Sequence, residues 1–552
     1  EKYSMEEKIP FFWCFSSNHR EFRNKATIAG IRLLENRTPV LVKVLDTFES
    51  VDDPYVIERM YAVACGVAMR EQDTNDLKEL ATVIHRQVFS QETVPANIHV
   101  RDYAQAIMEV AAYRGCLPDS IESSSFRPPF KSKWPRIWSA RKSKEIEENK
   151  SWNEIFFSVR PNIIGMLYGD FGRYVMESRI HNFSRIKKTS KFSKDGENSL
   201  FDAQIAMRWT LQRVHKLGWT PDRFGKYEKC LPMRGPQTYH DDELKLERIS
   251  KKYQWIALYE LLGYLSDHYH MNDPSREFLG AWQIGIRDFD PSRPPHGIHT
   301  EDIPSSDNSV WGDYPDPFAD IELCANREAW VTREPDSFLP LISAPFMLKT
   351  GSPAKDWIAL GGYREWKESE YQAHLLGNKG RLDLWISLRS WLVMDSDFQR
   401  FLNVVNKIHF WGNGCSRVEL PDGWLGEYPW GMPFNDLSDC CKMPCSWTEH
   451  ISIPHIQTIC QWGDDGFEVP SPQICDLLDL RWAGDGATFK NDKGELICTQ
   501  RNRFCVVQKE ALIGSLKKNK SHLVWGLVGA KSCCDKDKWI VPKEFQFSGV
   551  YY

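Results

Sequence analysis

The sequence predicts an α+β protein in which a HEAT-like α-helical repeat is followed by a mixed, Trp-rich α+β region. Residues 15–113 divide into four or five apolar-periodic segments of helical length joined by short polar stretches. After about residue 356, short β-like runs appear between Gly-rich turns. The chain has 552 residues, several times the usual domain size, so two to four domains are expected.

The helical repeat is predicted over residues 1–117. Pro39 opens its second helix, and Asp53 followed by Pro54 looks like an N-cap and first helical position. The helix that starts there is apolar on almost every side, as expected for the inner helix of a stack. Residues 77–89 and 99–112 supply two more amphipathic helices. Stacked pairs bury such faces together, which favours a short solenoid. An ordinary helical bundle is the alternative, because no strict repeat period is present.

Residues 118–150 are predicted to form a basic, Pro-containing linker or arm, and the basic stretch 184–194 is predicted to loop. Basic residues interleaved with aromatic ones can hold phosphate groups, whereas a solvated loop is the alternative. The candidates for phosphate contacts are Arg127, Lys131, Lys133, Arg136, Lys187 and Lys188.

A mainly helical domain is predicted over residues 151–273. One helix covers residues 200–218 and ends at Gly218, and a long, strongly amphipathic helix covers residues 246–270. Residues 274–355 are dense in Pro and Asp and are expected to form an irregular excursion over a surface. A mixed α+β domain follows over residues 356–552, with strands predicted at 357–363, 382–393 and 522–531 and a helix at 396–408.

Composition limits the partners and the compartment that we expect for the protein. A formal net charge of −5 gives the whole molecule no field that would attract nucleic acid or anionic lipid. No window is apolar enough over about 20 residues to cross a membrane, so we expect a soluble protein without a membrane partner. The 15 cysteines have no framework spacing, which suits the reducing cytoplasm. Glu1 opens a start without a signal peptide, which we interpret as an interior cut of a longer chain.

The familiar catalytic signatures are absent from the sequence, including the P-loop, H-E-x-x-H, G-x-S-x-G and the dinucleotide motif. We therefore expect no catalytic residue, cofactor or metal in this chain itself. One group of metal-ligating residue types lacks a C-x-x-C pair, so free cysteines are the preferred interpretation over structural zinc. That group consists of Cys440, Cys441, Cys445, His450, His455 and Cys460.

Two further groups invite a chemical interpretation. Asp267, His268 and His270 could bind a metal or carry a proton, but helical residues two apart point to different sides, and a helix-terminal cap is preferred. Glu247, Lys251 and Lys252 could hold magnesium in a nuclease, although helix-surface ion pairs explain them more simply.

Tryptophan is unusually frequent, with 22 in the chain, many of them near Gly or Pro. Rings of this kind either fill the core or line a recognition surface. The candidates for target contacts are Tyr253 and Trp255 on the long helix, and Trp424 and Trp430 in a Gly-rich stretch.

Three stretches taken together resemble the C-terminal sensor region of bacterial STAND-class antiviral NTPases of the Avs type. The first comprises SSNHREFRNKATIAGIRLLENR, DDPYVIERMYAVACGVA and RDYAQAIMEVAAYRG; the second is LERISKKYQWIALYELLGYLSDHY; the third comprises SPQICDLLDLRWAGDG, LVWGLVGAK and SGVYY. The sequence departs from the family pattern at Ala530, where an acidic residue is expected.

The resemblance implies an upstream effector and a P-loop ATPase that uses ATP and Mg²⁺, both outside this chain. In such proteins the sensor binds a phage protein, and binding drives assembly into an oligomer and activates the effector. The resemblance supplies no catalytic residues for this chain. A nucleic-acid-binding or metal-dependent nucleic-acid-processing domain, built on residues 127–144 and 184–194, is the rival hypothesis, and an architectural scaffold is a third.

Overall fold

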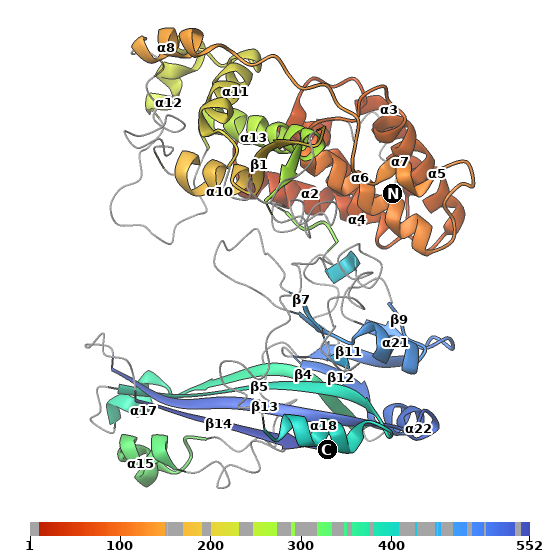
Figure 1. The fold of residues 1–552 in the computed structure, drawn as a ribbon, viewed down its shortest axis with the longest axis vertical. Coiled ribbons are helices and arrows are strands. Elements are labelled where there is room, and N and C mark those ends of the chain that lie inside the picture. Colours follow the sequence, from red (N-terminus) through yellow and green to blue (C-terminus); the bar gives the residue numbers. More distant parts are fainter. Residues whose placement is uncertain are drawn as a thin grey trace. The chain divides into compact units, whose positions relative to one another are not determined.

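The chain divides into two compact units (Figure 1). The helical unit contains residues 1–293 with 430–433 and 456–463, and the sheet unit contains the rest. The computed structural model describes residues 10–149, 152, 169, 171–189, 200–230, 247–272, 287, 289–292, 317–333, 347–349, 356–375, 380–407, 425–427, 448–449, 451–453, 467–482, 488–501, 504–535 and 543–552.

The first half of the helical unit is a two-layer stack. Its elements are η1 (Trp13–Ser16), α2 (Arg20–Leu34), α3 (Thr38–Phe48), α4 (Pro54–Ala68), α5 (Thr74–Ile84), η2 (His85–Phe89) and α6 (Ile98–Tyr113). Helix α4 packs between α2 and α6, while α3 packs against α5 (Figure 1). Alternate helices therefore share a layer, as the HEAT-like interpretation predicts. The predicted N-cap is confirmed, because Asp53 accepts a hydrogen bond from the Tyr55 amide at 2.9 Å.

The second half of the helical unit surrounds one long helix. Its elements are α7 (Ser123–Phe126), α8 (Ala140–Glu148), η4 (Phe171–Glu177), α10 (Ser178–Ile180), β1 (Phe183–Lys187), α11 (Ala203–Lys216), η6 (Pro221–Gly225), α12 (Lys226–Cys230), α13 (Ile249–His268) and β2 (Tyr269–Met271). Strands β1 and β2 pair antiparallel, so part of the predicted 184–194 loop is a strand. Helix α11 stops at Gly218, whose φ of +94° ends the helix as predicted.

Helix α13 differs from its prediction. Residues 256–259 and 261–263 are buried without a break, so the helix is enclosed on nearly every side and is not strongly amphipathic. It packs against both α6 and α11. Its polar residues are buried because they have partners: Ser250 donates to Glu228 Oε2 at 2.8 Å. A polar position in this part of the sequence therefore does not mark a solvent-facing side.

Residues 126–138 form an extended segment that packs along the helical unit, whereas their Pro and Lys content predicts an exposed arm. Phe126 and Phe130 are buried. The Gln212 side chain accepts from the Trp138 amide at 2.8 Å and donates to the Arg136 carbonyl at 2.9 Å. The predicted helical segments before and after this extended segment belong to one compact unit.

Most of the predicted excursion over residues 274–355 lies outside the described residues. The described residues 287 and 289–292 return to the helical unit and are buried, not spread over a surface. Tyr103 donates to the Phe289 carbonyl at 2.9 Å, and Arg287 pairs with Asp102. These contacts fix the segment to α6.

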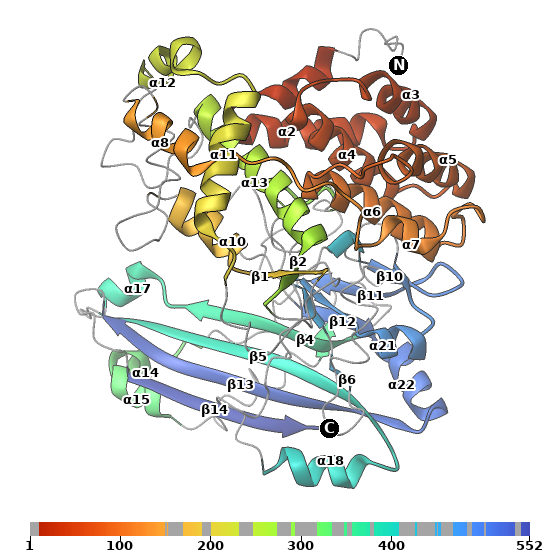
Figure 2. The ribbon, with the colours of Figure 1, turned by 45° about the horizontal axis from the view of Figure 1, so that its top comes forward.

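The sheet unit is built on one large antiparallel sheet. In the described residues the order of its strands is β14-β13-β5-β4-β12-β11-β10-β9, with β3 and β6 pairing at the side (Figure 2). The strands are β3 (Met347–Lys349), β4 (Asp356–Lys367), β5 (Gly380–Met394), β6 (Thr448–Glu449), β7 (Ile451–Ile453), β8 (Phe467–Val469), β9 (Arg481–Trp482), β10 (Thr488–Lys490), β11 (Leu496–Arg501), β12 (Phe504–Gln508), β13 (Ser521–Asp535) and β14 (Lys543–Tyr551). Strands β7 and β8 form a separate pair.

Short helices join and cover these strands. They are α14 (Ile321–Ala325), α15 (Arg327–Thr332), α17 (Glu370–Leu375), α18 (Phe398–Val405), η13 (Leu425–Glu427), α21 (Pro472–Leu477) and α22 (Lys509–Lys518). The three predicted strands correspond to β4, β5 and β13, and the predicted helix at 396–408 corresponds to α18. The α+β class is therefore confirmed. Across the described residues, no helix combines the length and the apolar character needed to span a bilayer.

Candidate ligand-binding cleft

The candidate site is a cavity of about 270 Å³ in the helical unit, where the end of α3, the start of α4 and the turn before α6 meet. We call it the α3–α4 cleft. Its floor is largely apolar and includes Leu45, Phe48, Ile57, Met60, Tyr61 and Val100. Such a floor favours a ligand group that leaves water on binding.

Four carboxylates border the same cleft, namely Glu49, Asp52, Asp53 and Glu260. Three of them lie together because α3 ends at Phe48 and α4 begins at Pro54, which makes residues 49–53 the connection at the start of α4. The positive end of the α4 dipole stabilises carboxylates there. Glu260 joins them from α13, about 200 residues later in the chain.

The carboxylates are only partly neutralised. Asp53 pairs with Lys252 at 3.3 Å, and Glu260 pairs with Arg213 through two contacts of 2.6 and 2.7 Å. Glu49 and the neighbouring Asp46 share Arg86, at 3.5 and 2.5 Å. Within the described residues, four carboxylates therefore share three cations, and the exposed fifth carboxylate, Asp52, makes no hydrogen bond or ion pair.

Burial shifts the pKa of two groups, one that lines the cleft and one that pairs with Asp53 beside it. Burial raises the pKa of the Tyr61 hydroxyl well above its usual value, and the negative charge of Glu49 raises it further. Burial also lowers the pKa of the Lys252 ammonium, against the opposing effect of Asp53. Tyr61 donates to Gln87 Oε1 at 3.2 Å and is neutral at physiological pH.

Asn97 lines the cleft and caps α6. Its Oδ1 caps α6 by accepting from the His99 and Val100 amides at 2.9 and 3.2 Å. Its Nδ2 has no hydrogen-bond partner among the described residues, although the residue lines the cavity and is only 7 % exposed. A buried donor without a partner costs about 1–3 kcal/mol, which is part of the cost of placing this cap in the core.

The turn that carries Asn97 is held against α13. A Cβ built on Gly263 would lie 1.8 Å from the Ala96 carbonyl oxygen, so only glycine permits this approach. Arg101 reinforces the junction by donating to both Asp267 oxygens at 3.0 and 2.9 Å and to the Gly263 carbonyl at 3.3 Å. The position of one side of the cleft thus depends on two contacts with α13.

The pair with Arg101 also uses the carboxylate of Asp267, which argues against the alternative of a metal-binding or proton-carrying group with His268 and His270. The neighbouring His268 ring lies 3.2 Å from Ser132 Oγ and edge-on to Trp134, at a centroid distance of 5.6 Å. His270 belongs to β2. In the part of the chain that the structure describes, no three His, Cys, Asp or Glu residues converge as a metal site.

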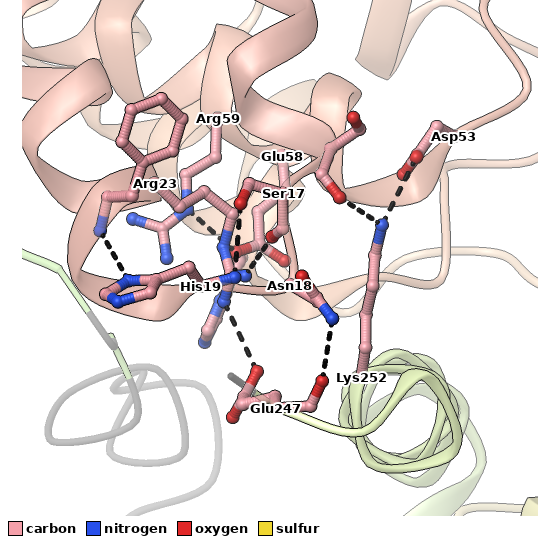
Figure 3. A network of polar contacts seen from close by, with 12 residues as sticks. Ser17, Asn18, His19, Arg23, Asp53, Glu58, Arg59, Glu247 and Lys252 are labelled. Atoms are coloured by element: carbon pink, nitrogen blue, oxygen red, sulfur yellow. Dashed lines mark hydrogen bonds and ion pairs between the residues drawn. The ribbon is translucent and has the colours of Figure 1, made fainter. Parts of the chain in front are cut away.

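A polar network anchors the start of α13 to the N-terminal helices (Figure 3). Lys252 Nζ donates to the Ser16 carbonyl at 2.8 Å in addition to pairing with Asp53. The Glu247 amide donates to the Asn18 carbonyl, and Asn18 Nδ2 donates to the Glu247 carbonyl, both at 2.9 Å. The cleft carboxylate of Asp53 is therefore part of a fixed framework.

The side chains of Glu247, Lys251 and Lys252 do not converge as a metal-dependent nuclease site would require. The Glu247 carboxylate pairs with Arg23 at 3.7 Å. Lys252 is buried in its contacts with Ser16 and Asp53, whereas Lys251 is exposed. Glu247 and Lys252 thus hold the fold, and the three side chains do not form one catalytic group. The prediction of ion pairs along the helix surface is also wrong for two of these residues. Glu247 pairs with Arg23, and Lys252 pairs with Asp53, so both reach other elements of the fold.

The other predicted site residues are distributed over the molecule. Tyr253 and Trp255 are partly buried against the core of the helical unit, and the Trp255 ring lies edge-on to Phe171 at 5.1 Å. Trp424 and Trp430 lie outside the described residues, and so do Cys440, Cys441, Cys445, His450, His455 and Cys460.

Among the phosphate candidates, Arg127 forms two 2.7 Å contacts with Glu109, and Lys188 donates to the Ser266 carbonyl at 2.7 Å. The remaining candidates are exposed: Lys131, Lys133, Arg136 and Lys187.

The cleft itself is absent from the sequence prediction. The run DTFESVDDP contains its acidic residues, but the pattern predicts only a helix cap there. A search for acidic residues that flank the connection between two apolar helices would find this half of the cleft. Glu260 and Asn97 carry no comparable local signal.

Comparison with known proteins adds no assignment. No family model matches the chain, and no curated protein matches it.

Proposed function

We propose that this chain is the ligand-sensing, protein-binding part of a larger bacterial antiphage STAND NTPase. It recognises a phage protein and thereby triggers assembly and effector activation by upstream parts of the same chain. The chain itself contributes binding and no catalysis. ATP and Mg²⁺ belong to the upstream ATPase, and the active assembly is a homo-oligomer.

The observation that carries the proposal is the α3–α4 cleft, a largely apolar cavity bordered by the carboxylates of Glu49, Asp52, Asp53 and Glu260. Protein recognition concentrates its energy in a few desolvated anchors that enter such cavities. The cleft lies in a helical stack whose elements are joined by buried ion pairs, including Arg101–Asp267, with exposed side-chain fractions of 0 % and 1 %. A preorganised surface of this kind loses little entropy on binding.

The resemblance to the sensor region of Avs-type proteins supports the viral origin of the ligand, and the layered helices support the same architecture. The nucleic-acid alternative rests on residues 127–144 and 184–194, in which Lys131, Lys133, Arg136 and Lys187 are exposed. It is weakened by Trp134, whose ring packs edge-on to Tyr269 at 5.1 Å and is not a free stacking platform.

The test uses the intact natural protein and a panel of individually cloned phage proteins. Each is co-expressed with the intact protein, and complexes are measured by affinity capture and light scattering. We expect one phage protein or one structural class to form a stoichiometric complex and to induce oligomerisation. Absence of any complex across the panel, or metal-dependent cleavage of DNA or RNA by the purified chain, would contradict the proposal.

A further inference from the structure

We propose that α4 and α6 form a binding site for an extended peptide of the pattern Arg-x-Phe-x-Pro, which residues 287–292 fill within the same chain and which a protein ligand takes over by displacing them. This inference rests on the proposed protein-sensing function and adds a contact separate from the α3–α4 cleft. We call the described residues Arg287, Phe289, Asp290, Pro291 and Ser292 the docked segment. They serve as a template, because they show which groups the two helices recognise.

The helices hold the docked segment largely by its main chain. The Tyr103 hydroxyl donates to the Phe289 carbonyl at 2.9 Å, and Arg70 donates to the Pro291 and Ser292 carbonyls, both at 3.4 Å. Tyr103 and Arg70 are 0 % and 8 % exposed. Every residue of an extended peptide carries a carbonyl oxygen, so buried donors that address carbonyls can receive another peptide in the same way.

Gly66 on α4 makes room for this main chain. A Cβ built there would lie 2.8 Å from the Pro291 carbonyl oxygen and 2.6 Å from Ile31 Cδ1. Glycine is disfavoured within a helix, and its use here is explained by the close approach of a backbone. The surface of α4 is therefore shaped to receive a peptide at this point.

Two side chains of the docked segment set the sequence preference. Arg287 pairs with Asp102 through its Nε, and its guanidinium lies over the Tyr103 ring at 5.2 Å from the centroid. The Phe289 ring lies 5.5 Å from the Arg59 guanidinium carbon. Arg287 and Phe289 are each 3 % exposed. A ligand for this site therefore needs a cation and, two residues later, an aromatic ring.

The place of the docked segment in the chain favours exchange. The continuous part of the helical unit ends at residue 293, so the docked segment is its last portion before the chain passes to the sheet unit. Irregular segments at the end of a unit open at lower free energy than its core helices. A tethered segment has an effective concentration on the order of millimolar at its own site, so only a ligand with further contacts elsewhere can displace it. A folded protein meets that condition, whereas a short free peptide does not.

The first experiment is hydrogen exchange of the intact protein, followed by mass spectrometry in increasing urea. We expect the peptide that contains residues 289–292 to be protected at least about tenfold less than α4 and α6, with little dependence on urea, because it opens without unfolding the helices. Exchange of this segment only together with α4 and α6 would overturn the inference.

The second experiment measures binding of a fluorescent peptide of residues 284–294 by anisotropy. The wild type should not bind it, because the site is filled. Arg287→Ala/Phe289→Ala weakens the docked segment and leaves its site intact, so this double variant should bind the peptide at least about tenfold more tightly than a matched peptide with alanine at both positions. Adding Asp102→Asn should weaken binding at least about fivefold, whereas adding Glu79→Gln, at an exposed carboxylate of α5, should not change it.

Equal binding of the two peptides would overturn the inference. Failure of the double variant to fold would also overturn it, since a displaceable segment can leave without loss of the helices. If a phage protein binds the intact protein without increasing exchange at residues 289–292, the inference fails while the proposed function stands. If the double variant binds the peptide and no phage protein binds, the peptide site stands while the proposed function fails.

Discussion

Arg101 on α6 and Asp267 on α13 form a bidentate ion pair with distances of 3.0 and 2.9 Å, although 166 residues separate them in the sequence. Their side chains are 0 % and 1 % exposed. The same guanidinium donates to the Gly263 carbonyl. This pair joins the helical repeat to the long helix and supports the turn that borders the α3–α4 cleft.

Breaking that pair on one side should destabilise the helical unit strongly. Asp267→Asn leaves Arg101 as a buried cation without a counter-charge, which typically costs about 3–5 kcal/mol. The double variant Arg101→Met/Asp267→Leu should be less destabilised than the single variant, because both charges are removed. Urea unfolding followed by circular dichroism gives the free energies. A loss below about 1 kcal/mol for Asp267→Asn would contradict the structural role of the pair.

Gly263→Ala should damage the junction between α13 and the turn at Ala96. The new Cβ would lie 1.8 Å from the Ala96 carbonyl oxygen, so backbone must move, at a cost of about 1–3 kcal/mol or more. Gly514→Ala in α22 is the matched control, since a Cβ there meets nothing within 4 Å. That substitution should be neutral or stabilise by up to about 1 kcal/mol through helix propensity. Thermal unfolding compares the two, and equal midpoints would refute the close approach.

Alkaline pH should destabilise the helical unit through Tyr103. Burial raises the pKa of its hydroxyl well above 10 in the folded protein. The group therefore contributes stability that is complete below about pH 10 and is lost as the pH rises above the pKa of the unfolded phenol. Tyr103→Phe should reduce this pH dependence. Tyr371→Phe, which changes an exposed tyrosine, should leave it as in the wild type. Urea midpoints from about pH 8 to 11 provide the measurement, and identical slopes for all three proteins would contradict it.

In the sheet unit, Lys531 on β13 should prove structurally important. The side chain is 1 % exposed, and its Nζ donates to the Trp330 carbonyl at 3.0 Å and to the Arg333 carbonyl. Lys531→Met removes the Nζ donor from these carbonyls at the end of α15 and should cost about 1–3 kcal/mol. Hydrogen exchange should show earlier opening of α15. Unchanged exchange rates there would show that the cap contributes nothing.

Local signals explain which parts of the fold are predictable. The Asp53–Pro54 cap and the Gly218 stop act within one turn, so both can be recognised from sequence. Strands β5 and β13 are recognisable from β-like composition, but their pairing in register depends on contacts far apart in the chain. The prediction of a strongly amphipathic α13 is wrong because Ser250 and Lys252 are polar yet buried with partners.

The cleft cannot be predicted for the same reason. Its acidic connection is visible in the sequence, but Glu260 reaches it only through the packing of α13, and Asn97 lines it only because the cap of α6 is held against α13. Tyr253 and Trp255, chosen for their ring chemistry, pack against the core of the helical unit. Their contact with a ligand stays a prediction.

The most direct test of the central claim is isothermal titration of the intact protein with the phage protein selected from the panel. The wild type is compared with the Glu49→Gln/Asp52→Asn double variant, which neutralises two exposed carboxylates of the cleft, and Glu79→Gln, at an exposed carboxylate of α5 that does not line the cleft, is the control. If the cleft is the recognition site, the affinity of the double variant falls by about 3- to 20-fold at low salt, because two carboxylates that border the cleft lose their charge. An affinity equal to that of the wild type would contradict recognition through the α3–α4 cleft.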